Sequence, residues 1–303
     1  AEAMGLYNNA TATLQGTTIF TVEATAGEKF EAGNMVGEAS AKGYGIYNQG
    51  ASLTTDDLVF SKVYATGKVG SEASVEAYGL YNTDNNATLI LGNLTFTDVK
   101  GIAGNSSTSG NATALVAAIA NESGNLQTGK IIGTVTAQGG SGPNGSGEAY
   151  GIMNSNGPIT ATSLDLTVIA KGGAGTEEAT GVAKGLDNNG NSTITTTSGA
   201  NILTVQSYGG KSNSTTETGN VSARAYGINN ASQVNMSGTT TLAVNATGGK
   251  PATMSGTDVY LADDASAAAY GINNEGSYFG MVNLASRAVK VNGATVSRAT
   301  AIA

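Results

Sequence analysis

The stretch RAYGINN at residues 224–230 decides the fold, because the chain repeats it. A pattern of Gly, an aliphatic residue, a variable residue and Asn occurs eight times, with Ala118 in place of Gly in one copy. The other copies are AAYGINN (268–274), EAYGIMN (148–154), EAYGLYN (76–82), KGYGIYN (42–48), EAMGLYN (2–8), LVAAIAN (115–121) and VAKGLDN (182–188). Successive copies lie 33 to 44 residues apart. Repeats at this spacing are typical of solenoids, propellers and other repeat arrays.

The composition indicates a packed chain that lacks several catalytic residue types. The 303 residues include 44 Gly and 3 Pro but no Cys, His or Trp, and 12% of them are charged; ordinary domains contain about 25% charged residues. Hydrophobic residues make up 40%, which is too many for a disordered segment. The missing His and Cys exclude Ser-His-Asp triads, thiol nucleophiles and the usual zinc ligands.

Charge and hydropathy limit the kinds of partner that the chain can bind. The net charge is −8, and the 14 Lys and Arg residues are scattered singly, so we expect no nucleic-acid partner. No apolar run is long enough to cross a bilayer, and we expect no membrane span in this segment. The sequence begins at Ala1 without an apolar signal peptide, so we expect that, if the protein is exported, its signal has been removed. It also begins and ends at the same phase of the repeat, which predicts that residues 1–303 are a single array within a longer rod.

The segments between the motifs predict strands. Residues 87–91 (ATLIL) and 164–173 (LDLTVIAKGG) illustrate short stretches with β-branched residues at period two, and no helical periodicity occurs. We predict an all-β, right-handed parallel β-helix of about eight coils, each with three short strands. Variable inserts rich in Gly, Ser, Thr and Asn, such as 211–222 and 250–267, follow the third strand. They predict that every insert leaves from one corner, which in solenoids is often the binding face.

Coil stacking predicts two files of equivalent side chains from the motif. Neighbouring coils lie about 4.8 Å apart, so an Asn that recurs once per coil forms a ladder of amides. Each amide can donate a hydrogen bond to the Asn of one neighbouring coil and accept one from the Asn of the other. The ladder residues are Asn8, Asn48, Asn82, Asn121, Asn154, Asn188, Asn230 and Asn274. The aliphatic residue two positions earlier should form an interior stack, and Gly should let the chain bend before it.

The tyrosine that precedes the motif glycine is the candidate surface residue. It occurs as Tyr44, Tyr78, Tyr150, Tyr226 and Tyr270. Charged residues lie two positions earlier in the same strands, so alternation predicts an outward, partly exposed aromatic column. The bend at Gly leaves the inward orientation open as an alternative.

A polysaccharide-cleaving site needs paired carboxylates on one face. Asp56 and Asp57 are adjacent and would point to opposite faces of a strand, while Asp165 and Asp187 lie in different coils. We therefore predict no catalytic residues, no metal site and no cofactor. A polysaccharide-active lyase or hydrolase remains the alternative hypothesis.

Coils of small residues, the Asn ladder, outer faces rich in Thr and Ser, and the absence of Cys together resemble the passenger regions of bacterial autotransporters and related surface adhesins. This resemblance is architectural and covers the whole chain. It implies an outer-membrane translocator elsewhere in the gene, display on the bacterial cell surface, and a non-enzymatic rod that holds adhesive surfaces away from the cell. The expected partners are a host or bacterial surface ligand, or further copies of the chain that associate end to end or laterally into fibres.

Overall fold

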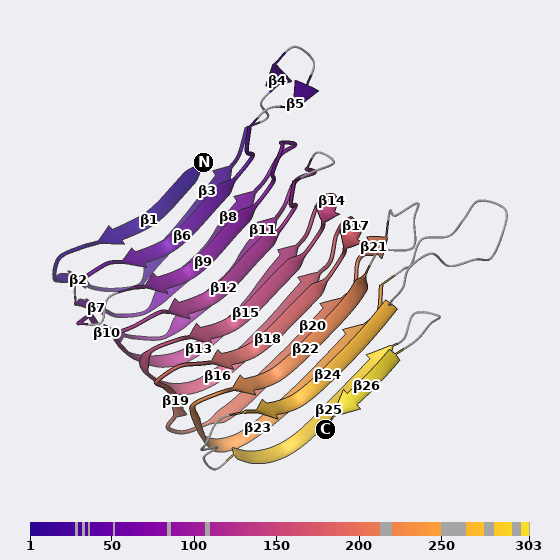
Figure 1. Ribbon diagram of the computed structural model, residues 1–303. Helices are drawn as coiled ribbons and strands as arrows, with labels where there is room; N and C mark the ends of the chain where they lie inside the picture. The colour runs from indigo at the N-terminus through magenta and orange to yellow at the C-terminus, as the bar shows by residue number, and fades with distance from the viewer. Residues whose placement is uncertain are drawn as a thin grey trace.

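Parallel pairing of equivalent strands builds the protein into a β-solenoid (Figure 1). The structure is a computed structural model. It describes residues 1–27, 30–31, 34–35, 37–50, 52–83, 86–106, 110–212, 220–249, 265–275, 282–292 and 298–302. These residues contain strands and no helix, which confirms the all-β parallel architecture.

The repeated motif forms a nine-stranded parallel sheet. The motif residues pair in register from coil to coil, for example Ile46 with Leu80 and Asn48 with Asn82. In sheet order the strands are β1 (Glu2–Asn8), β6 (Ala41–Asn48), β9 (Val75–Asn82), β12 (Ala114–Asn121), β15 (Gly147–Asn154), β18 (Gly181–Asn188), β22 (Val221–Asn230), β24 (Ala265–Asn274) and β26 (Arg298–Ile302).

The segments between the motifs form a second sheet of twelve strands. Its short strands are β2 (Ala12–Leu14), β3 (Thr18–Thr25), β7 (Leu53–Thr55), β8 (Leu58–Thr66), β10 (Thr88–Leu91), β11 (Leu94–Ile102), β19 (Ser192–Thr196), β20 (Ala200–Tyr208) and β25 (Val282–Asn292). In three coils the second and third predicted strands run together as β13 (Asn125–Gln138), β16 (Gly157–Lys171) and β23 (Gln233–Thr247). The expectation of three separate strands per coil is therefore wrong for these coils.

The number of turns differs slightly from the expected eight. About six turns have a neighbouring turn on both sides in both sheets. The first coil pairs on one side only, and β25 pairs only with β23 among the described strands.

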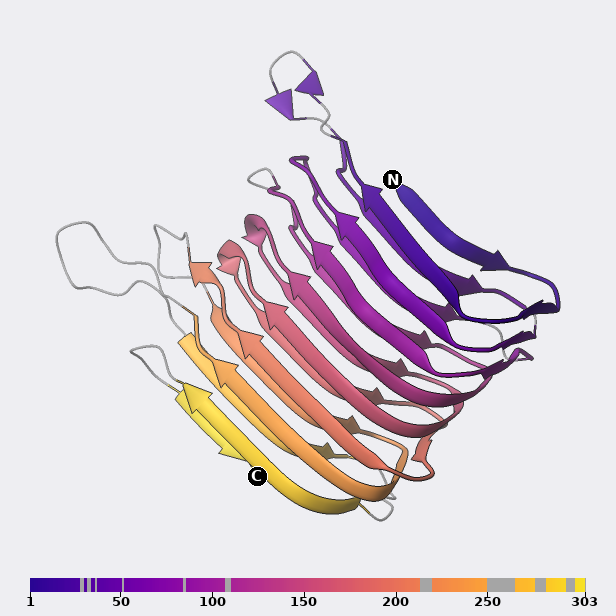
Figure 2. The same cartoon turned by 180° about the vertical axis from the view of Figure 1, so that it is seen from behind.

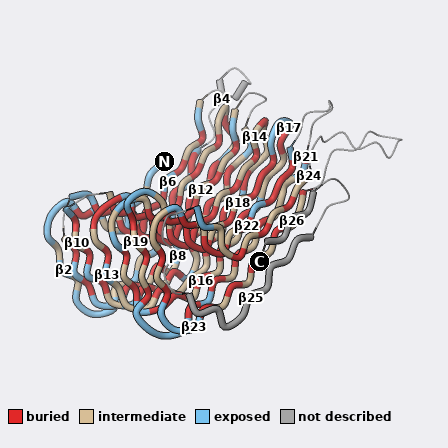
Figure 3. The backbone as a smooth tube through the Cα atoms, turned by 60° about the horizontal axis from the view of Figure 1, so that its bottom comes forward, coloured by how far each residue is buried: buried red, intermediate tan, exposed pale blue. Residues whose placement is uncertain are grey.

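The core fills the space between the two sheets along the stack (Figure 3). The aliphatic residue of the motif points inward, as Ile46, Ile119 and Ile152 show with no exposed surface. In the twelve-stranded sheet, Phe60 stacks between Phe20 and Phe96 of the neighbouring strands, with ring centroids 5.4 and 4.7 Å apart. Each coil thus buries its apolar side chains against the coils above and below.

The motif glycine is required by space. A Cβ on Gly45 would lie 2.4 Å from the carbonyl oxygen of Gly79 and 2.5 Å from the Phe60 ring. A Cβ on Gly151 would lie 2.4 Å from the carbonyl oxygen of Gly185. Left-handed glycines occur outside the motif, for example Gly157 with φ 94°. The motif glycine therefore also permits close approach between coils, which the expectation of a bend did not include.

The described parts of the inserts leave the stack along one edge, as predicted (Figures 1 and 2). Three of them form a small parallel sheet of β14 (Ser141–Asn144), β17 (Ala174–Glu178) and β21 (Lys211–Ser212), and another forms the antiparallel pair β4 (Phe30–Glu31) and β5 (Asn34–Met35). Glycine pairs let successive coils pass closely at this corner. A Cβ on Gly173, for example, would lie 1.9 Å from the carbonyl oxygen of Gly140. Of the inserts expected at 211–222 and 250–267, residues 213–219 and 250–264 lie outside the described residues.

Candidate functional site

The asparagines of the motif form a continuous hydrogen-bonded ladder. In each step the Nδ2 of one Asn donates to the Oδ1 of the Asn in the next coil, at 2.7 to 3.0 Å. The members are Asn8, Asn48, Asn82, Asn121, Asn154, Asn188, Asn230 and Asn274, and the first seven are at most 4% exposed. The Nδ2 of Asn154 also donates to the backbone oxygen of Gly157 at 3.1 Å, which closes the corner. The amides are occupied by one another, so the ladder stabilises the coil and presents no free group to a ligand.

The candidate tyrosines lie in one file on the outer side of the nine-stranded sheet. Tyr44, Tyr78 and Tyr150 belong to an apolar cluster separate from the interior core and are only 4 to 7% exposed. Tyr226 and Tyr270 are half-buried, with ring centroids 4.8 Å apart. Ring stacking along the file covers the aromatic faces. The file is therefore more buried than alternation alone suggested.

A second outer file, which the sequence reasoning missed, runs beside the first. It is formed by the residue just before each ladder Asn and contains Tyr7, Tyr47 and Tyr81 in the first three coils. The ring of Tyr47 lies 5.7 Å from Tyr7, 5.2 Å from Tyr81 and 5.1 Å from Tyr44. The variable position of the motif could have predicted this second file, because the Asn points inward and alternation along a strand points the preceding residue outward.

Burial shifts the ionisation of the tyrosine cluster. Loss of hydration and the nearby Glu76 carboxylate raise the pKa of Tyr44 and of Tyr78 above the usual 10.0. Burial also raises the pKa of Tyr81, whose hydroxyl donates to Oε1 of Glu122 at 2.6 Å. These phenols stay neutral well into the alkaline range, so the cluster is an apolar feature at physiological pH.

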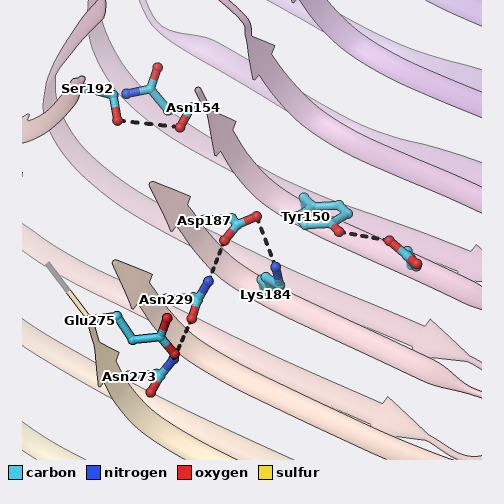
Figure 4. Close-up of polar contacts among 9 residues, drawn as sticks. Tyr150, Asn154, Lys184, Asp187, Ser192, Asn229, Asn273 and Glu275 are labelled. Carbon is cyan, nitrogen blue, oxygen red and sulfur yellow. Dashed lines mark hydrogen bonds and ion pairs between the residues drawn. The ribbon is translucent and has the colours of Figure 1, made fainter. Parts of the chain in front are cut away.

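Three coils replace the file tyrosine, with Met4, Ala117 and Lys184. The coil of Lys184 carries a charged network (Figure 4). Lys184 occupies the tyrosine position between Tyr150 and Tyr226, with Nζ 5.3 and 6.0 Å from the two ring centroids. Nζ also lies 3.0 Å from Oδ2 of Asp187, which is 4% exposed. The Lys ammonium thus continues the aromatic file through cation–π contacts and an ion pair.

The acidic residues considered for catalysis are separated. Asp56 accepts a hydrogen bond from the backbone N–H of Gly16 at 2.7 Å, whereas Asp57 accepts from the backbone N–H of Asn93 in the coil on the other side, at 2.8 Å. Asp165 lies 3.7 Å from Nζ of Lys130. The structure does not bring these carboxylates together, and each bonds to a neighbouring coil. In the part of the chain that the structure describes, no group of three or more His, Cys, Asp or Glu side chains could hold a metal ion.

The insert corner presents polar surface next to a shallow pocket. In β17, Thr176, Glu177 and Glu178 are exposed. A pocket of about 480 Å³ between β16 and β20 lies at the foot of this corner, lined by Lys171 and Tyr208 among others. The corner therefore offers charged and polar groups that the solenoid core does not use.

Comparison with protein families, with curated proteins and with solved structures gave no match for this chain. Within the described residues, no helix is long and apolar enough to cross a membrane.

Proposed function

We propose that this protein is a non-enzymatic structural and adhesive rod of a bacterial surface protein, similar in architecture to an autotransporter passenger. The observation that carries the proposal is that the coils supply the stable core, whereas the inserts at one corner supply the polar surface. Apolar side chains and the Asn ladder hold successive coils in register, and the inserts leave along one edge, where they form an additional small sheet.

This division suits a spacer that presents a lateral surface. Stacked coils gain length without a larger core, because each coil contacts only its neighbours. The polar insert corner is then repeated along the rod, so several weak contacts act together through multivalency. Its partner in this proposal is a ligand on a host or bacterial cell, and self-association into fibres is the related form.

Adhesion of coated beads tests the proposal. Beads that carry the purified chain should attach to a panel of bacterial and host cells or to one another, whereas albumin-coated beads should not. A variant with Thr176, Glu177 and Glu178 changed to Ala should lose most of this attachment. The matched control changes Thr197 and Ser198 to Ala, which are exposed in a turn between β19 and β20, and it should attach like the unaltered chain.

Two results would contradict the proposal. One is equal attachment of the corner variant and the unaltered chain, because the insert corner would then play no part. The other is release of new reducing ends or unsaturated products from a polysaccharide panel, because the rod would then be an enzyme. Electron microscopy at rising concentration separates the two forms of adhesion, since only self-association lengthens or bundles the particles.

A further inference from the structure

A lysine amine and an asparagine amide share one buried carboxylate on the outer face of the nine-stranded sheet (Figure 4). Nζ of Lys184 lies 3.0 Å from Oδ2 of Asp187, and Nδ2 of Asn229 donates to Oδ1 of the same carboxylate at 2.6 Å. Lys184 and Asp187 belong to β18, whereas Asn229 belongs to β22 in the next coil. The carboxylate therefore holds a nucleophile and an acyl group from two neighbouring coils.

The surroundings limit access of water to this trio. The side chain of Asp187 is 6% exposed and that of Lys184 is 19% exposed. The rings of Tyr150 and Tyr226 flank the Lys184 amine on both sides. A site from which water is largely excluded favours attack by the held amine over hydrolysis.

A further contact polarises the amide of Asn229. Its Oδ1 accepts a hydrogen bond from Nδ2 of Asn273, on β24, at 2.7 Å. Negative charge develops on this oxygen when a nucleophile adds to the amide carbon, and a donor already in place stabilises that charge. Nucleophile, proton carrier, acyl group and oxyanion donor are therefore all present in one hydrogen-bonded chain.

We propose that Lys184 and Asn229 form an intramolecular isopeptide bond, with Asp187 as the proton carrier. Asp187 accepts a proton from Nζ of Lys184, and the neutral amine attacks Cγ of Asn229. Asp187 then passes that proton to Nδ2 of Asn229, the Cγ–Nδ2 bond breaks, and ammonia leaves. Ammonia takes the remaining extra proton from the linked nitrogen and departs as ammonium. One C–N bond forms and one breaks, so the step needs no oxidant or further reactant.

The reaction is a single turnover between groups that the fold already holds near each other. Such proximity gives intramolecular reactions high effective molarities, so a slow step still goes to completion over the lifetime of a rod. The product joins two residues 45 positions apart in sequence, since 229 minus 184 is 45. It would clamp two coils covalently, a constraint that acts chiefly on the unfolded chain.

Intact mass spectrometry of the folded chain tests the proposal. The expected mass is lower than that calculated from the sequence by one ammonia molecule. Tryptic digestion should yield a branched peptide that joins the segment containing Lys184 to the segment containing Asn229. Lys184→Arg keeps a cation beside Asp187 and the two rings, but its guanidinium is not a nucleophile, so this variant should show the full calculated mass. Asp187→Asn keeps the shape but removes the proton carrier, and it should also show the full mass.

Two outcomes would overturn the proposal. The first is a full calculated mass for the unaltered chain after prolonged incubation at neutral pH, with folding verified by circular dichroism. The second is the same ammonia loss in folded Lys184→Arg, because that loss would come from succinimide formation at an asparagine and not from the lysine.

Discussion

Replacing Asn154 with Leu tests how much the amide ladder contributes to stability. Asn154 is fully buried and takes part in three good hydrogen bonds: it accepts from Asn121 and donates to Asn188 and to the backbone oxygen of Gly157. Each such bond contributes about 1 kcal/mol net. The substitution removes all three, and the apolar burial of Leu offsets part of the loss. We expect a decrease of about 2 kcal/mol in the free energy of unfolding.

The neighbours of Asn154 keep part of their bonding, which limits the loss. Nδ2 of Asn121 still donates to the backbone oxygens of Gly124 and Asn156, and Oδ1 of Asn188 still accepts from Oγ of Ser192 at 2.7 Å. Neither amide is therefore left without a partner. A loss well above that of three bonds would indicate that the whole corner rearranges.

Hydrogen exchange measured by mass spectrometry is the suitable assay, because solenoids open locally as well as globally. A loss of about 2 kcal/mol corresponds to an exchange rate roughly 30 times faster, and we expect it in β15 and β18 with little change in β1. Asn191→Leu serves as the matched control, since Asn191 is exposed. Unchanged exchange in Asn154→Leu, or equal acceleration in the control, would refute the role of the ladder.

Two further predictions follow from packing and ionisation. Gly79→Ala should lower the free energy of unfolding by about 3 kcal/mol through overpacking, because the new Cβ would lie 2.3 Å from the ring of Phe96. Gly27→Ala is the control and should be neutral, because the space around Gly27 is open. Equal thermal midpoints for the two variants would contradict the packing argument. Burial raises the pKa of Tyr78 above 10.0. The contribution of this phenol to the free energy of unfolding is therefore complete below pH 10. Above pH 10 the unfolded chain ionises first, and the contribution falls by up to about 1.4 kcal/mol per pH unit. Tyr78→Phe should therefore flatten the alkaline fall in denaturant midpoint, and an unchanged slope would show that this phenol ionises equally in both states.

The motif predicted most of the fold because few architectures accommodate both its spacing and its Asn. An Asn at one position of every coil is stable in the interior only when its amide is paired, and stacking supplies that pairing. The apolar period of two likewise specified strands, and the position of the inserts specified the corner. These features depend on local pattern, which a sequence displays directly.

Other features depended on neighbours that the sequence does not place. The motif glycine is needed because of the carbonyl oxygen of the next coil, as at Gly45 and Gly79, whereas the sequence alone predicted only a bend there. The burial of Tyr78 results from stacking with Tyr44 in the adjacent coil and from contact with the ring of Tyr81 in its own strand. The trio around Asp187 combines residues of two coils, so only the register between β18 and β22 brings it together.

Distances between spin labels on successive coils test the parallel in-register stack most directly. Thr134, Thr167, Thr204 and Ala243 are register partners in four consecutive coils, and the chain has no native Cys to interfere with labelling. Cysteine pairs at 134 and 167, at 134 and 204, and at 134 and 243 should give separations that rise by about 4.8 Å per coil. Separations that do not increase in this order would contradict the solenoid, and with it the rod that we propose.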